Sequence, residues 1–92
     1  MESIYLQNNL KLSFEKLPHT IRVIISKNNE EWVCKKERLR KLLEFVNIDE
    51  AHIFKGRLQL IKMNDHITLQ VKNENISTIL TKTFIEVLNK LK

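Results

Sequence analysis

Residues 58–71, LQLIKMNDHITLQV, decide the fold because they define a β-hairpin of fixed register. Apolar and polar side chains alternate on both sides of the Asn64-Asp65 pair, which is the period of half-buried strands. Asn and Asp tolerate the positive φ that a two-residue hairpin loop requires. We therefore expect strands over Ile53–Met63 and His66–Lys72. The predicted cross-strand pairs are Leu58 with Val71, Leu60 with Leu69, Gln59 with Gln70, and Arg57 with Lys72.

The same alternation predicts a second hairpin nearer the N-terminus. Leu10–Phe14 and Ile21–Ile25 each alternate apolar with polar residues, and Lys16–His19 can form the loop between them. A turn is expected at Lys27–Glu30, and Trp32–Cys34 is expected to return as a short third strand. The predicted apolar pairs are Phe14 with Ile21, Leu12 with Val23, and Leu10 with Ile25.

Two helices complete the pattern. Lys35–Val46 has leucines at the spacing of one helical face, and a second apolar stripe runs to Leu91 from a cap at Asn75 or Ser77. The expected fold is α+β, with an antiparallel four- or five-stranded sheet in two hairpin-plus-helix units, ββ(β)α-ββα. Both helices are expected to pack on one face, and residues 1–92 are expected to form a single domain.

The composition excludes disordered, collagen-like and linker proteins. The chain is 42% hydrophobic and 29% charged with one Gly and one Pro, which is typical of a globular domain. A single cysteine excludes an intramolecular disulfide, and the sequence shows no export signal and no apolar run that could span a bilayer. We expect a cytoplasmic protein without membrane association.

The net charge of +5 is concentrated in two segments. Five bases and one acid occupy residues 35–41, at the expected start of the first helix. Bases there oppose the helix macrodipole, whereas an anion would gain both the side-chain charges and the free backbone N–H groups. A phosphate backbone is a common ligand of this kind. The alternative is a solvated helix face. The predicted phosphate contacts are Lys35, Lys36, Arg38, Arg40 and Lys41.

The second basic segment is the outward face of the late hairpin, where Lys55, Arg57 and Lys72 are expected to lie. Arg57 opposite Lys72 is a like-charge pair that an anion would relieve. An ordinary polar sheet face is the alternative. Trp32 is the best candidate for an exposed ring, and the aromatic residues otherwise occupy apolar positions. Binding directed at the phosphate backbone therefore fits better than readout of bases.

The sequence offers no catalytic cluster and predicts neither a metal nor a cofactor. His19, His52 and His66 are too far apart for a local metal motif. The single glycine excludes a phosphate-binding glycine loop. Cys34 precedes the basic segment, where its thiolate would be stabilised, but a structural cysteine is the expected role.

One segment resembles a family of enzymes. Residues 51–55, AHIFK, follow a predicted helix and precede strands and a terminal helix containing TFIEVL at 83–88. This arrangement is similar to that of the HicA-type mRNA interferase toxins, in which a helix leads into a strand that carries the catalytic His, although the order of strands differs. The resemblance covers about half of the chain and departs from the family pattern where Glu50-Ala51 replaces a Gly-Ser pair. It implies that His52 would be the catalytic acid or base.

These observations favour a small, basic, non-enzymatic nucleic-acid-binding protein, with an acidic protein surface as the other candidate partner. A protein-binding regulator or inhibitor that acts through a sheet face or edge is the alternative. Ile24 and Ile61 are expected on the outer face, as a covered surface or a homodimer through a sheet edge or face would require. The HicA-like ribonuclease is the third alternative.

Overall fold

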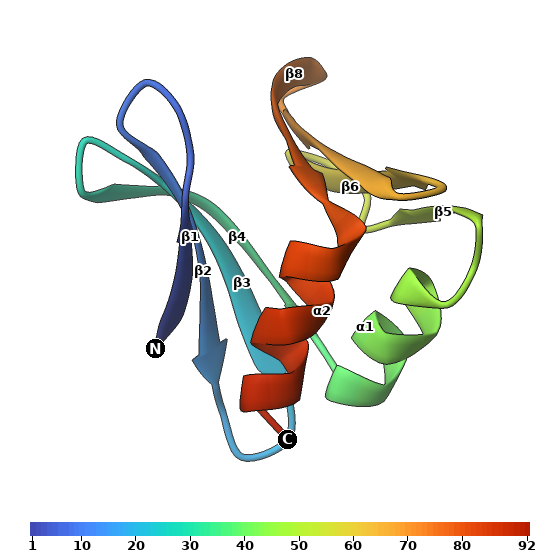
Figure 1. The fold of residues 1–92 in the computed structure, drawn as a ribbon. Helices are drawn as coiled ribbons and strands as arrows, with labels where there is room; N and C mark the ends of the chain where they lie inside the picture. The colour runs from blue at the N-terminus through green and yellow to red at the C-terminus, as the bar shows by residue number, and fades with distance from the viewer.

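The computed structural model describes residues 1–92 as two successive units, each of four antiparallel strands followed by a helix (Figure 1). The first unit comprises β1 (Glu2–Tyr5), β2 (Leu10–Lys16), β3 (Ile21–Lys27), β4 (Glu30–Glu37) and α1 (Leu39–Val46). The second comprises β5 (Glu50–Ile53), β6 (Leu58–Met63), β7 (His66–Val71), β8 (Glu74–Leu80) and α2 (Thr81–Lys90). The predicted α+β class and the two units that each end in a helix are confirmed, and the strands form two sheets rather than one.

The first sheet has the order β1-β2-β3-β4 and a register that differs from the predicted one by two residues. Phe14 pairs with Val23 rather than with Ile21. The hairpin loop is shorter than expected, because the amide of Leu17 donates to the carbonyl of Thr20 at 2.8 Å. The ladder therefore continues to the end of β2. The apolar face is kept, since a shift of two residues preserves which side each residue occupies.

The second sheet has the order β5-β6-β7-β8 and confirms the predicted hairpin, with Leu58 opposite Val71 and Leu60 opposite Leu69. The single strand predicted over Ile53–Met63 is wrong. Phe54 and Gly56 adopt positive φ values of 71° and 88°, which end β5 and open a loop before β6. These residues form a hairpin connection that the alternation of apolar residues did not reveal.

Both predicted helices begin later than expected. Lys35 and Lys36 belong to β4, where they lie opposite Val23 and Arg22. The apolar spacing of a helix holds only from Leu39 onward, which is where α1 begins.

The segment before the second helix is also a strand. Lys72 and Asn73 form a tight turn with φ of 53° and 67°, and β8 then pairs with β7 before α2 begins at Thr81. Because β8 and α2 are both rich in apolar residues, helical spacing alone could not separate them.

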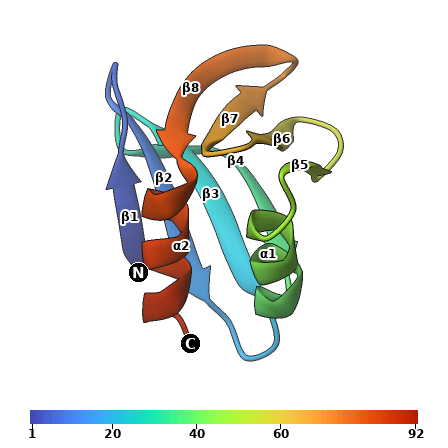
Figure 2. The same cartoon turned by 45° about the vertical axis from the view of Figure 1, so that its right-hand side comes forward.

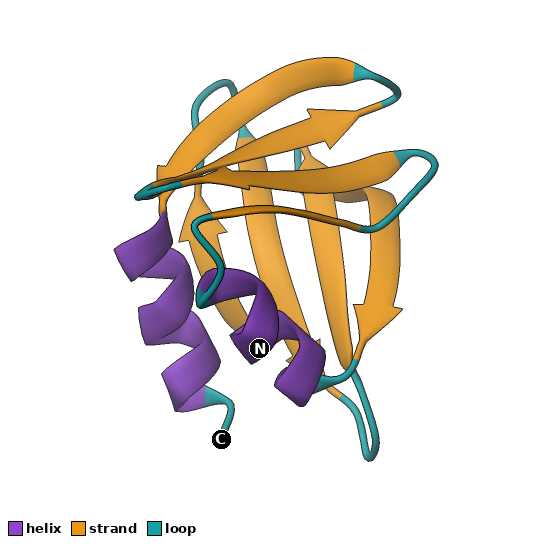
Figure 3. Cartoon of the chain, turned by 90° about the vertical axis from the view of Figure 1, so that its right-hand side faces the viewer, coloured by secondary structure: helices purple, strands orange, loops and turns teal.

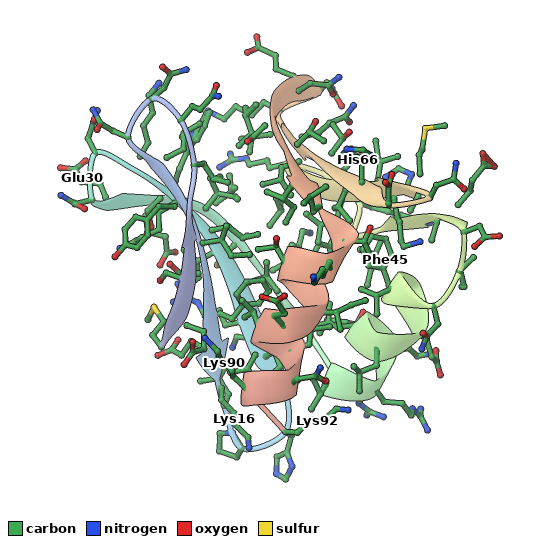
Figure 4. The ribbon with its side chains drawn as sticks, viewed as in Figure 1. Lys16, Glu30, Phe45, His66, Lys90 and Lys92 are labelled. Carbon is green, nitrogen blue, oxygen red and sulfur yellow. The ribbon has the colours of Figure 1, made fainter.

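The two units share one core. The helices lie side by side beneath the second sheet and across one face of the first (Figures 1 and 2), and the strands of the second sheet run across those of the first (Figure 3). Phe84 of α2 meets Phe14 of the first sheet and Phe45 of α1, edge to face, with ring centroids 5.3 and 6.1 Å apart. Figure 4 shows Phe45 at the end of α1 nearest the second sheet. Neither helix has the length and apolar surface needed to cross a bilayer.

Candidate functional site

The predicted basic segment 35–41 is divided among three places rather than gathered at a helix start. Side chains alternate along β4, so Lys35 shares the core side with its partner Val23, whereas Lys36 lies on the opposite side with Arg22. The prediction that these two lysines belong to one helix N-terminus is therefore wrong.

The remaining bases of that segment lie at the start of α1. Arg38 is the N-cap residue, and its amide donates to a carboxylate oxygen of Glu37 at 2.9 Å. Arg40 and Lys41 are exposed, and the Lys41 ammonium lies 3.8 Å from Glu44. Basic side chains therefore do lie at the start of α1, as predicted. However, none of them lines the depressions around Trp32, where other predicted residues lie.

The second basic segment meets the first unit at the loop between β5 and β6. The amide of Lys72 donates to the carbonyl of Arg57 at 2.8 Å, so the β7–β8 turn and the β5–β6 loop lie at the same end of the second sheet (Figure 3). The Lys35 ammonium is 3.7 Å from the point that a Cβ on Gly56 would occupy. The fold thus brings Lys35 of the first unit to the loop that carries Lys55 and Arg57.

Trp32 lies beside this meeting point, at an irregularity in β4. Val33 pairs with Ile25 and Glu31 pairs with Ser26, so Trp32 is the extra residue of a β-bulge and has no partner across the strands. Its side chain is half-buried and packs against the common core. The Lys27 ammonium lies 5.2 Å from the centroid of the Trp32 ring, within the range of a cation–π contact.

Two shallow depressions share Trp32 and Glu31. The first, of about 340 Å³, is also lined by Lys27, Asn28 and Glu30. The second, of about 300 Å³, is lined by five consecutive residues of β4, Glu31 to Lys35, and by Arg57 of the second unit. Because β4 is an edge strand, the second depression follows an edge whose outward backbone groups have no partner in the sheet. We call the whole region the Trp32 surface, which comprises Lys27, Trp32, Lys35, Lys55, Arg57 and Lys72.

The electrostatics of this region favour an anion. None of the five basic residues of the Trp32 surface forms an ion pair. Two carboxylates, those of Glu30 and Glu31, line the depressions around Trp32. That of Glu31 forms a short contact with the Arg22 guanidinium, and Arg22 also lies 3.4 Å from Glu15. The hydrogen bond to Glu31 raises the pKa of Arg22 above its usual value. The Glu31 charge is therefore compensated by Arg22, and no carboxylate pairs with the basic residues around Trp32.

Sequence reasoning missed Lys27 and could not connect Trp32 with the late hairpin. A signal for Lys27 was present, since it is the first residue of a predicted turn and lies five residues before the only tryptophan. The link between Trp32 and Arg57 was not accessible, because it depends on how two units separated along the chain pack together.

The groups considered for catalysis lie elsewhere. His52 is exposed on β5, and its Nε2 lies 2.8 Å from the carboxamide oxygen of Gln59. The shallow depression beside His52 shares no residue with those around Trp32. Cys34 is half-buried on β4. No group of three metal-ligating side chains comes together in the structure.

Comparison with known proteins identifies no relative: no protein-family model, no curated protein and no solved structure matches this chain.

Proposed function

We propose that this protein binds nucleic acid through the Trp32 surface, with the phosphate backbone as the principal contact. The observation that carries the proposal is that basic side chains without ion pairs come from both units to the region around one half-buried tryptophan. Lys35 comes from β4, whereas Arg57 and Lys72 come from connections of the second sheet. Folding alone does not require like charges to gather there, and a phosphate chain would relieve their repulsion.

The proposal shifts the expected contact residues. Lys35, Lys55, Arg57 and Lys72 keep the role that the sequence suggested, and Lys27 joins them. Lys36, Arg38, Arg40 and Lys41 lie outside the Trp32 surface and are proposed to make secondary contacts at most.

The binding constant should fall with salt concentration, and the slope should report how many phosphates the protein neutralises. Neutralising five phosphates would give a slope of log K against log salt of about −3.5 on a single strand, or about −4.5 on a duplex. Fluorescence anisotropy of a labelled oligonucleotide across a potassium chloride series measures this slope. Absence of binding at low salt would contradict the proposal.

A matched pair of double variants locates the site. Lys35→Gln with Arg57→Gln should reduce the steepness of the slope by about 1.4 on a single strand, because two phosphate contacts are lost. Arg40→Gln with Lys41→Gln removes the same charge from exposed positions on α1 and should change the slope less. Equal effects of the two double variants would show that only net charge matters and would remove the site from the proposal.

A protein-binding role is the second candidate, and the edge of the second sheet favours it. β8 is an edge strand of seven residues with a single charged residue, Glu74. Edge strands that lack charge and proline can pair with another strand. Leu80, the last residue of β8, is 50% exposed, so pairing there would also cover apolar surface. A second copy of the chain is the simplest partner for this edge.

The HicA-like ribonuclease can be distinguished from both candidates by whether bound RNA is cleaved. Cleavage of an RNA oligonucleotide that is abolished by His52→Ala would support it, whereas intact RNA recovered from the complex would favour binding alone.

A further inference from the structure

We infer that the Trp32 surface takes single-stranded nucleic acid, with one base stacked on the Trp32 ring in the depression beside Arg57. This inference rests on the proposed function and specifies its ligand. It starts from the only tryptophan of the chain, which is neither fully buried nor free at the surface.

The ring is held in place by the protein. Trp32 packs on the common core, and the following residue, Val33, is buried with 6% of its surface exposed. A ring fixed in this way can receive a base at a small entropic cost, because few side-chain rotamers remain to be ordered on binding. The two depressions that share Trp32 leave space beside it.

The chemistry around the ring matches a nucleotide. Base–aromatic stacking is tolerant of sequence because every base has a π-face, and arginine guanidinium groups also stack on bases. Arg57 lines the same depression as Trp32, and Lys35 lies in it to meet a phosphate. The free edge of β4 supplies backbone donors and acceptors at the rim, where the edge of a base would lie.

A duplex cannot use this arrangement. The faces of paired bases are covered by their neighbours in the stack, so a duplex would offer the Trp32 surface phosphates and groove edges but no base face for the ring. A single strand offers both phosphates and an accessible base face. The structure therefore favours the single strand by the contribution of one stacked base.

The test uses Trp32 as its own reporter. An unlabelled single-stranded DNA oligonucleotide should quench the tryptophan emission, and the matching duplex should bind more weakly without comparable quenching. Trp32→Leu should weaken single-strand binding between about 5-fold and 100-fold, as expected for the loss of one stacked base. Anisotropy of a labelled oligonucleotide gives the affinity of this variant, which has no tryptophan.

The conservative variant separates stacking from folding. Trp32→Phe keeps an aromatic face and should retain more affinity than Trp32→Leu at the same circular dichroism signal. If Trp32→Leu is unfolded, the comparison of wild type with Trp32→Phe and the quenching by single strand against duplex still test the inference.

The outcomes separate the inference from the proposed function. Equal affinity for single strand and duplex, without quenching, would overturn the inference and leave backbone binding intact. No binding of either would overturn both. Quenching by an oligoglutamate peptide as strong as that by DNA would assign the surface to an acidic peptide and overturn the single-strand reading.

Discussion

Replacement of Phe84 by alanine tests whether the two units fold as one body. Phe84 has no exposed surface and contacts Phe14 of the first sheet and Phe45 of α1. Truncation of a buried phenylalanine to alanine costs about 3–5 kcal/mol. The loss of two edge-to-face pairs, each contributing about 0.5–1.5 kcal/mol beyond buried area, places this variant in the upper half of that range.

The expected loss is large against the stability of a domain of this size, which is about 5–15 kcal/mol. Phe84→Leu provides a milder change, expected to cost about 1–3 kcal/mol, because most of the apolar volume is kept but both aromatic pairs are lost. Glu86→Ala, on the exposed side of the same helix, is the matched control and should stay within about 0.5 kcal/mol of wild type.

Urea denaturation monitored by two signals gives the result. Trp32 fluorescence reports on the first sheet, whereas circular dichroism in the far ultraviolet reports on both units. Because the core is shared, Phe84→Leu should lower the unfolding midpoint equally in both signals. A variant that shifts the circular dichroism transition but leaves the Trp32 transition unchanged would show that the units unfold separately, and would refute the common core.

Two further predictions concern a turn and a sheet edge. Asn73 has a φ of 67°, so Asn73→Val should destabilise the protein by about 1–2 kcal/mol, whereas Asn73→Gly should be neutral or stabilising; thermal unfolding measures both, and equal effects would contradict the left-handed turn. If β8 pairs with a second copy, light scattering at high concentration should show a dimer that Thr78→Lys disrupts and that Thr68→Lys, the same change on the neighbouring strand, disrupts less. A mass of 11.0 kDa at every concentration would remove this homodimer.

The parts of the fold that depend on neighbouring residues could be predicted from the sequence. The Asn64-Asp65 loop fixed the register of its hairpin, and the predicted pairs of Leu58 and Leu60 are confirmed. The first hairpin was misplaced by two residues because a longer loop satisfied the same alternation. Period two identifies the buried face of a strand but leaves shifts by two residues undetermined.

The predicted boundaries of helices and strands are wrong where one sequence pattern is compatible with both a helix and a strand. Lys35 and Lys36 precede a helical stripe, yet β3 extends far enough to pair with them, so tertiary pairing outweighs local preference. At Lys62, by contrast, the local strand pattern agrees with the structure. Its position in phase with Leu58 and Leu60 places it on the buried face, where its ammonium donates to the carbonyl of Ile48 at 2.6 Å.

The candidate site depends on long-range packing, which explains why its predicted members proved partly right. Lys35 and Arg57 were each singled out for charge, but their meeting follows from the second sheet lying across the first. Conversely, the five bases of segment 35–41 are adjacent in sequence and divided in space. A strand sends consecutive side chains to opposite sides, so proximity along the chain does not ensure a shared surface.

The two units repeat one architecture, yet their last strands present different edges, and this contrast supports assigning different ligands to them. β4 carries charged side chains at both ends, whereas β8 has only Glu74. Charged side chains on an edge oppose the addition of another strand, because pairing would bring them against the incoming chain. The β4 edge is therefore the less suitable place for a peptide strand. A nucleic acid needs no continuous backbone ladder, and at the Lys35 end of β4 it would gain from the lysine that disfavours one. This contrast is the reason for proposing a polyanion at the Lys35 end of β4 and a second protein chain at β8.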